Sequence, residues 1–208
     1  MFGIHDFSIF LASCILLNLT PGPDTLYILG RSMAQGRSAG VASALGISTG
    51  SVVHTFAAAF GLSALLATSA SAFLAVKLAG AAYLVYLGAR MLFRRTAEAA
   101  IPSGFSSAGF AAAWRQGMIT NLLNPKVALF FLAFVPQFIA TDSPAKFTAF
   151  VLLGLTFVTT GTLWCLCLAW LSSMFSARLQ KSRSLSDLLN RTAGAVFVGL
   201  GVRLAASK

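Results

Sequence analysis

Residues 19–25 read Leu19-Thr20-Pro21-Gly22-Pro23-Asp24-Thr25 and lie inside an apolar run that extends over residues 7–29. The run is long enough to cross a bilayer as a helix, since about 20 residues span the ~30 Å hydrocarbon core. Two prolines around a glycine cannot continue that helix, because each proline lacks a backbone donor and its ring clashes with the preceding turn. We therefore predict a helix that breaks at mid-membrane, with unpaired backbone groups and the carboxylate of Asp24 at the break.

A break of this kind has two interpretations. It is either a proline kink that only shapes packing or the place where a ligand binds. Backbone groups and charges at bilayer depth are tolerated only where they face protein or a water-filled cavity. Two prolines followed by an acid therefore favour a binding site over a simple kink.

The composition places the whole chain in a membrane. The chain has 208 residues, of which 57% are hydrophobic and 10% charged, and its mean hydropathy is +0.83. A soluble domain carries about 25% charged residues. The apolar runs are continuous, unlike the alternating strands of a membrane barrel, so we predict an all-α integral membrane protein. The net charge of +10 does not indicate nucleic-acid binding, because the basic residues fall between the apolar runs.

Six apolar runs predict six transmembrane helices, at residues 7–29, 39–67, 73–93, 117–139, 147–175 and 188–206. The fourth run repeats the pattern of the first, because Pro125 interrupts it and Lys126 follows the proline. Two amides, Asn121 and Asn124, precede that proline. The second run contains one ionisable residue, His54.

Basic residues predict the orientation of these helices. The loops after the first, third and fifth runs and the adjoining run ends hold ten Lys and Arg residues, whereas the other side holds four. Cytoplasmic loops carry an excess of Lys and Arg, so we expect both termini on the opposite side. Residues 1–6 contain no Lys or Arg, unlike the basic start of a cleaved signal peptide, so the first run is expected to be retained.

The two halves of the chain resemble each other. Residues 18–21 (NLTP) correspond to 121–125 (NLLNP) with one insertion, and 87–90 (LGAR) correspond to 200–203 (LGVR). Each half has three runs, so the second copy enters the membrane upside down, as in many transporters. We predict one transporter domain over 1–208 made of two inverted three-helix repeats, with helices 1 and 4 broken at mid-membrane. The first repeat is 1–95, the linker 96–113 and the second repeat 114–208.

The two breaks provide opposite charges and free helix ends. A new half-helix begins after each break with free backbone donors, which suit a carboxylate. Asp24 can bind an ammonium group or carry a proton, and Lys126 can bind a carboxylate or pair with Asp24. This combination fits an α-amino acid better than a sugar or a metal ion. The predicted substrate-binding residues are Asn18, Pro21, Gly22, Pro23, Asp24, Asn121, Asn124, Pro125 and Lys126.

Proton coupling is assigned to Asp24 and to His54. A lone histidine inside a membrane helix is more often a hydrogen-bonded structural residue, so both roles stay open for His54. The three cysteines lie within apolar runs and are expected to be small buried side chains. The sequence has no nucleophile–base pair and no metal-ligand spacing, so we expect neither an enzyme nor a metal or cofactor site.

Several short motifs resemble the LysE/RhtB-type amino-acid exporter family over nearly the whole chain. They are residues 20–24 (TPGPD), 36–40 (GRSAG), 44–46 (ALG), 83–88 (YLVYLG), 120–126 (TNLLNPK) and 135–138 (VPQF). The resemblance implies a six-helix bacterial inner-membrane exporter of amino acids or related metabolites, driven by the proton gradient. The termini would then lie in the periplasm. Members of this family differ in substrate, and no motif here selects one.

One acid and one base at the breaks favour a neutral substrate, such as homoserine, threonine or leucine, over a dibasic one. A channel-like or structural membrane protein is the alternative. A channel would need a ring of like subunits and a continuous pore, and the sequence signals neither. Small residues on the second and third runs suit packing within the chain or a homodimer equally well.

Overall fold

The computed structural model describes residues 2–68, 70–93, 109–172 and 183–206. Within these ranges the regular elements are helices, apart from one isolated bridge between Ile4 and Ile139, which confirms the predicted all-α class. The helices are α1 (Phe7–Leu19), α2 (Pro23–Gln35), α3 (Arg37–Thr68), α4 (Ala70–Phe93), α5 (Phe110–Leu122), α6 (Pro125–Leu129), the π-helix η1 (Phe130–Phe134), the 3-10 helix η2 (Val135–Phe138), α7 (Lys146–Trp170) and α9 (Arg183–Ala206).

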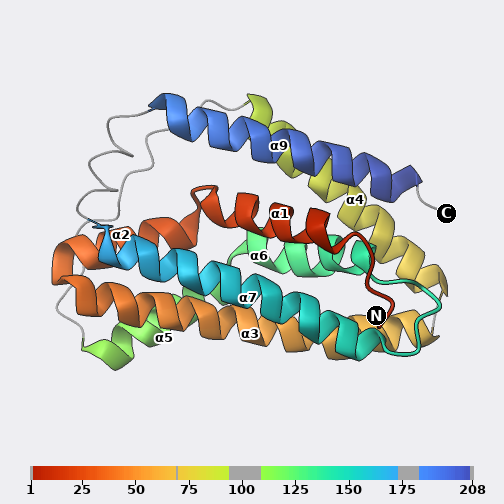
Figure 1. Cartoon of the computed structure of the whole chain (residues 1–208), viewed down its shortest axis with the longest axis horizontal. Helices are drawn as coiled ribbons and strands as arrows, with labels where there is room; N and C mark the ends of the chain where they lie inside the picture. Colours follow the sequence, from red (N-terminus) through yellow and green to blue (C-terminus); the bar gives the residue numbers. More distant parts are fainter. Residues whose placement is uncertain (1, 69, 94–108, 173–182, 207–208) are drawn as a thin grey trace.

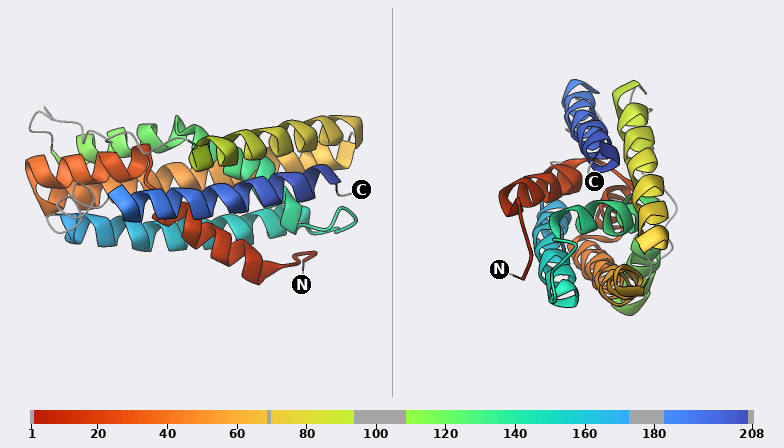
Figure 2. Two further views of the ribbon diagram at one scale, coloured as in Figure 1. Left: turned by 90° about the horizontal axis from the view of Figure 1, so that it is seen from above. Right: turned by 90° about the vertical axis from the view of Figure 1, so that its right-hand side faces the viewer.

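The long helices run along a common direction and form two packed groups. Helix α3 lies between α5 and α7, and α4 packs along α9 at one edge of the molecule (Figures 1 and 2). Helices α1 and α6 lie between these groups in Figure 1. The arrangement brings α1 and α2 from the first half of the chain against α5, α6 and α7 from the second.

Both predicted helix breaks are present. The axes of α1 and α2 differ by 47° across a break at residues 20–22, and those of α5 and the helical segment after Pro125 differ by 50°. Each break ends with a proline at the first position of the next helix, where its missing N–H leaves no bond unmade. The second break is also capped, because Asn124 Oδ1 accepts a 3.1 Å hydrogen bond from the backbone N–H of Lys126.

Two helices of the described residues are long and apolar enough to cross a membrane, Arg37–Ala64 and Lys146–Trp170. Each bent pair can form one further span, which makes up to four. These match the first, second, fourth and fifth predicted runs. The third and sixth runs correspond to α4, whose apolar part Leu78–Phe93 is shorter, and to α9.

Several predicted boundaries differ from the observed ones. Helix α5 begins at Phe110, so residues 110–113 of the predicted linker are helical, and α9 begins at Arg183 rather than at 188. Alanine-rich and charged residues form helix readily outside an apolar run, and hydropathy alone does not detect this. The rest of the linker up to residue 108, and residues 173–175 of the fifth predicted run, lie outside the described residues.

Glycines let the backbones of α3 and α5 touch. A Cβ atom added to Gly46 would clash with the carbonyl of Trp114, and one added to Gly117 would clash with the carbonyl of Ser43. Small residues at helix interfaces in membranes allow such close approach. The packing interpretation of these small residues in the second run is therefore confirmed for Gly46.

We expect Gly46→Ala to lower the free energy of unfolding by about 1–3 kcal/mol, because the added methyl group meets backbone atoms that cannot move aside. Gly61→Ala on the same helix is the matched control, since a Cβ there has no heavy atom within 4 Å. The control should be neutral or stabilising by up to about 1 kcal/mol, because alanine favours helix more than glycine does. Thermal melting of the two purified variants in detergent checks this, and equal melting temperatures would contradict it.

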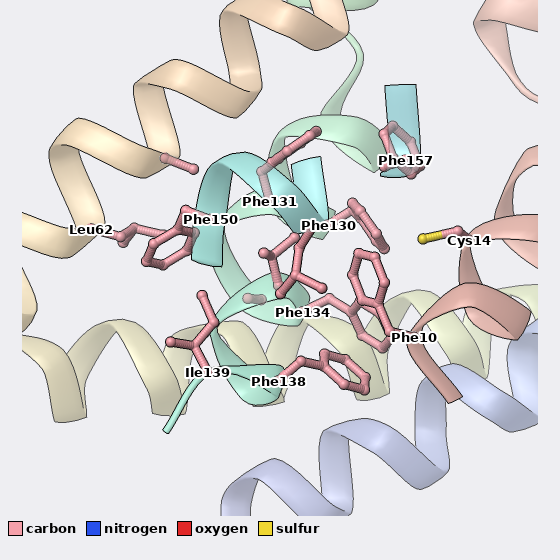
Figure 3. Packing of buried hydrophobic residues seen from close by; sticks show 14 of the residues in the cluster. Phe10, Cys14, Leu62, Phe130, Phe131, Phe134, Phe138, Ile139, Phe150 and Phe157 are labelled. Carbon is pink, nitrogen blue, oxygen red and sulfur yellow. The ribbon is translucent and has the colours of Figure 1, made fainter. Parts of the chain in front are cut away.

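An aromatic cluster fills the interior next to the second break (Figure 3). Phe130 stacks on Phe157 with ring centroids 4.5 Å apart and on Phe134 at 5.0 Å. Phe10 of α1 meets Phe138 edge-on at 5.1 Å. The π-helix η1 presents Phe130, Phe131 and Phe134 to this core, and all three are buried. The cluster therefore joins α1, α7 and the segment after Pro125 on the side of the chain's N-terminus.

Candidate functional site

A cavity lies where the two breaks meet, between α1, α2, α3, α5, α6 and α7. Its lining residues are Leu17, Asn18, Gly22, Asp24, Thr25, Ile47, Ser48, Ser51, Asn121, Asn124, Lys126, Val127, Phe157, Gly161, Thr162, Trp164 and Cys165. The cavity has about 40 Å³ of space. One buried water needs roughly 10–15 Å³ on this measure, so the space holds about three waters. The cavity would have to widen before an amino acid could fit into it.

Asp24 presents one oxygen that is bound and one that is not. Its position in the first turn of α2 follows from the break at Pro21 and Pro23. The Oδ2 atom accepts a 2.8 Å hydrogen bond from Nδ2 of Asn121. The Oδ1 atom is buried and has no hydrogen-bond partner among the residues that the structure describes. A buried acceptor of this kind is ready for a donor from a ligand.

Lys126 completes the end of α1 instead of pairing with Asp24. Its ammonium group donates 2.9 Å hydrogen bonds to the carbonyls of Leu17 and Thr20. In an unbroken helix the N–H of residue 21 would serve the carbonyl of Leu17, but Pro21 has no N–H. The carbonyl of Leu17 keeps a 3.3 Å bond from the backbone N–H of Thr20, and Lys126 adds a second donor, whose positive charge suits the negative end of the α1 dipole.

Within the described residues no ion pair joins Lys126 to Asp24 at 4.0 Å or less. The expectation that the two charges can pair with each other is therefore not met in this structure. An ammonium group has three donors, and the two bonds to α1 leave a third. Because Lys126 also lines the cavity, this third donor is placed to serve a ligand there.

His54 plays at the second break the part that Lys126 plays at the first. Pro125 cannot donate to the carbonyl of Asn121, which lies one helical turn before it and accepts a 3.0 Å bond from the backbone N–H of Asn124. His54 Nε2 lies 3.3 Å from that carbonyl oxygen, within hydrogen-bond reach for the tautomer protonated at Nε2. The imidazole stacks on Phe131, with ring centroids 5.9 Å apart and planes at 13°. His54 is absent from the cavity wall and stands behind Asn121.

The structure thus brings six of the nine predicted substrate residues to the cavity wall: Asn18, Gly22, Asp24, Asn121, Asn124 and Lys126. The three prolines, Pro21, Pro23 and Pro125, create the breaks but do not line the space. Asn18 is held by a 3.2 Å hydrogen bond from its Nδ2 to Oγ1 of Thr160 on α7. The amides therefore come from both halves of the chain.

The sequence did not reveal the walls that α3 and α7 contribute. Ser48 on α3 and Thr162 on α7 join their hydroxyls at 2.7 Å, and Ser51 donates to Oδ1 of Asn121 at 3.3 Å. Trp164 and Cys165 extend the α7 wall. The available signal was the run of hydroxyl residues on both helices, which within an apolar span marks a face that meets other polar groups.

Comparisons with known proteins cover almost the whole chain. The sequence model of a family described as LysE type translocator matches residues 15–208. A leucine efflux protein of Klebsiella pneumoniae is 33% identical over 205 residues, which is 98% of this chain and 96% of that protein. Leucine efflux proteins of Salmonella typhimurium and of an Enterobacter species are 29% and 28% identical over 204 residues, with 98% of this chain and 96% and 97% of those proteins covered. No solved structure matches the chain.

Proposed function

The chain belongs to the LysE type translocator family, so it is a multi-pass membrane protein, and from this premise we propose that it exports a neutral amino acid by proton antiport. The observation that carries the proposal is the cavity between the two helix breaks. One carboxylate oxygen without a partner and one lysine line it, together with apolar side chains. An amino acid with an aliphatic side chain has an ammonium group for the carboxylate oxygen, a carboxylate for the lysine and an apolar part for the apolar side chains.

The substrate's ammonium group is assigned to Oδ1 of Asp24. Its carboxylate is assigned to the third donor of Lys126, close to the amide of Asn124, which also lines the cavity. The aliphatic side chain then meets apolar wall residues, namely Leu17, Ile47, Val127, Phe157 and Trp164. Asp24 is the single acid of the cavity wall in the described residues, which disfavours a substrate with a second amino group.

Asp24 is also the proposed proton carrier. Protonation from the outside would neutralise the carboxylate and release the ammonium group, so that a proton enters as the amino acid leaves. His54 can influence this step through Asn121, which bonds to Asp24 by its side chain and lies within hydrogen-bond reach of His54 by its carbonyl. We therefore propose that His54 supports the site through Asn121 and does not contact the substrate.

The proposed architecture is a pair of inverted repeats over 1–95 and 114–208, and the packing of α4 on α9 supports it. A Cβ atom added to Gly88 would meet Gly194 and Val198, and one added to Gly201 would meet Ala81 and Val85. The sequence separation between Gly88 and Gly201 is the same as that between Ala81 and Gly194 and between Val85 and Val198. An antiparallel pair with this register is what a twofold axis between repeats produces.

The broken helices show a matching relation. Gly50 on α3 makes room for Asn121 of α5, and Gly161 on α7 lies against Asn18 of α1. Helix α3 of the first repeat thus contacts Asn121 of the second repeat. Helix α7 of the second repeat contacts Asn18 of the first repeat in the same way. The bacterial inner membrane with both termini in the periplasm is the proposed location, as the basic loops indicate.

Reconstituted protein tests the proposed function. Liposomes preloaded with radiolabelled leucine should lose it at least tenfold faster when the outside is acidified. Preloaded lysine should leave no faster than it leaves liposomes without protein. Liposomes without protein and a protonophore are the controls. Leucine flux that ignores the pH gradient would favour the channel-like alternative, and no flux of any amino acid would favour a structural protein.

A further inference from the structure

Helices α2 and α5 are joined by a series of polar contacts that begins at the cavity. The first contact is the bond from Asn121 to Asp24. In the second, the hydroxyl of Tyr27 donates to the carbonyl of Ala113 at 3.0 Å. In the third, Nη2 of Arg31 donates to Oε1 of Gln116. The α5 partners of Tyr27 and Arg31, Ala113 and Gln116, both precede Asn121 in the chain, so the two helices run antiparallel.

These α2 residues share one face of the helix, because positions three and four apart are neighbours on a helix surface. Tyr27 is 8% exposed and Arg31 2% exposed, so both fill the interior beyond the cavity. Nε of Arg31 also donates to the Tyr27 hydroxyl at 3.2 Å, and its Nη1 donates to Gln35 at 3.0 Å. The network therefore closes the interior between Asp24 and the end of α2 that leads to Arg37.

The other side of the cavity is closed by aromatic side chains instead of polar contacts. There Phe157 lines the space and stacks on Phe130, at the edge of the aromatic cluster (Figure 3). Opening an aromatic contact exposes apolar surface to water, whereas water can replace the hydrogen bonds of a polar network. The polar side is thus suited to open toward an aqueous compartment that supplies a zwitterion.

Helix α2 has a candidate hinge residue at each end. It begins after the break at Gly22, which is extended, and it ends at Gly36, whose φ of +84° is left-handed. Hinges are usually a few residues of this kind at the ends of an element. Helix α5, in contrast, touches α3 backbone to backbone at Gly46 and Gly117 and cannot separate from it easily.

We propose that Tyr27, Arg31 and Gln116 form the inner gate of the cavity, and that parting α2 from α5 opens it to the cytoplasm. The assignment rests on the proposed export function. Asp24 belongs both to the substrate site and to the first contact of the series. A substrate that binds Asp24 therefore acts on the same pair of helices that the gate has to separate.

The native Cys165 reports on the gate, because it lines the cavity and is 8% exposed. With Cys14 and Cys167 replaced by alanine, inside-out vesicles would be treated with a membrane-impermeant maleimide. We expect Gln116→Ala to label about tenfold faster than the parent, since loss of a hydrogen bond to a charged group raises the open population by about that factor. Thr49→Ala is the matched control, because it removes a 3.3 Å bond from Trp114 that joins α5 to α3 and not to α2.

The measurement needs no substrate, so its result is separate from that of the leucine assay. Faster labelling of Gln116→Ala from the cytoplasmic face, with Thr49→Ala at the parent rate, supports the gate. Equal rates in both variants, or acceleration from the periplasmic face of right-side-out vesicles, would overturn it. If Gln116→Ala does not fold, Tyr27→Phe removes one hydroxyl of the network at constant packing and should accelerate labelling in the same direction.

Discussion

Asp24→Asn is expected to insert and fold normally while losing proton-driven export. Asparagine keeps the shape of the side chain and can still accept the bond from Asn121. It cannot carry a negative charge for an ammonium group and cannot be protonated at physiological pH. Loss of a charge-assisted hydrogen bond corresponds to roughly 10- to 100-fold weaker binding, and the coupling to protons should disappear altogether.

The comparison also decides between a binding residue and a helix cap. Asparagine ranks beside aspartate as a cap, so a capping role would tolerate the change. In the structure Oδ2 of Asp24 bonds to a side chain and Oδ1 has no partner among the described residues, which does not fit a cap. Asp142→Asn in an exposed loop is the matched control. Normal leucine flux along a pH gradient in Asp24→Asn liposomes would defeat the proposed mechanism.

Lys126→Met should lose both transport and stability. Methionine keeps most of the apolar stem but removes the ammonium group that donates to the carbonyls of Leu17 and Thr20. Each hydrogen bond to a charged group contributes about 1.5–3 kcal/mol, so the free energy of unfolding should fall by about 3 kcal/mol or more. Asp24→Asn keeps an acceptor for the bond from Asn121 and should melt close to the parent.

Thermal melting in detergent and leucine flux, measured on the same preparations, separate the two roles of Lys126. Lys146→Met is the matched control, because Lys146 at the start of α7 donates to the nearby carbonyl of Ser143 and not to a broken helix end. A variant that melts normally but does not transport would mean that Lys126 serves the substrate alone. A Lys126→Met variant that transports normally but has a lower melting temperature would mean that Lys126 only stabilises the end of α1.

Local chemistry explains why the sequence located the breaks correctly. A proline lacks its N–H whatever surrounds it, so the stretch around Pro21 and Pro23 and the one around Pro125 end their helices in any fold. The same prolines remove the regular helical donor of the carbonyls of Leu17 and Asn121, which then accept bonds from the N–H groups of Thr20 and Asn124 instead. The sequence therefore indicated that these two carbonyls lose their regular helical donor, but not that Lys126 and His54 approach them.

The sequence by itself determined that the chain is helical and membrane-embedded, where its helices break, and that an acid and a base stand at the breaks. These features depend on composition and on residues adjacent in the chain. Only the tertiary structure decided that Lys126 bonds to the end of α1 rather than to Asp24, that His54 stands behind Asn121, and that α3 and α7 wall the cavity. Such pairings join residues far apart in sequence and depend on how each helix is rotated and how close glycines let two backbones come, which no local pattern encodes.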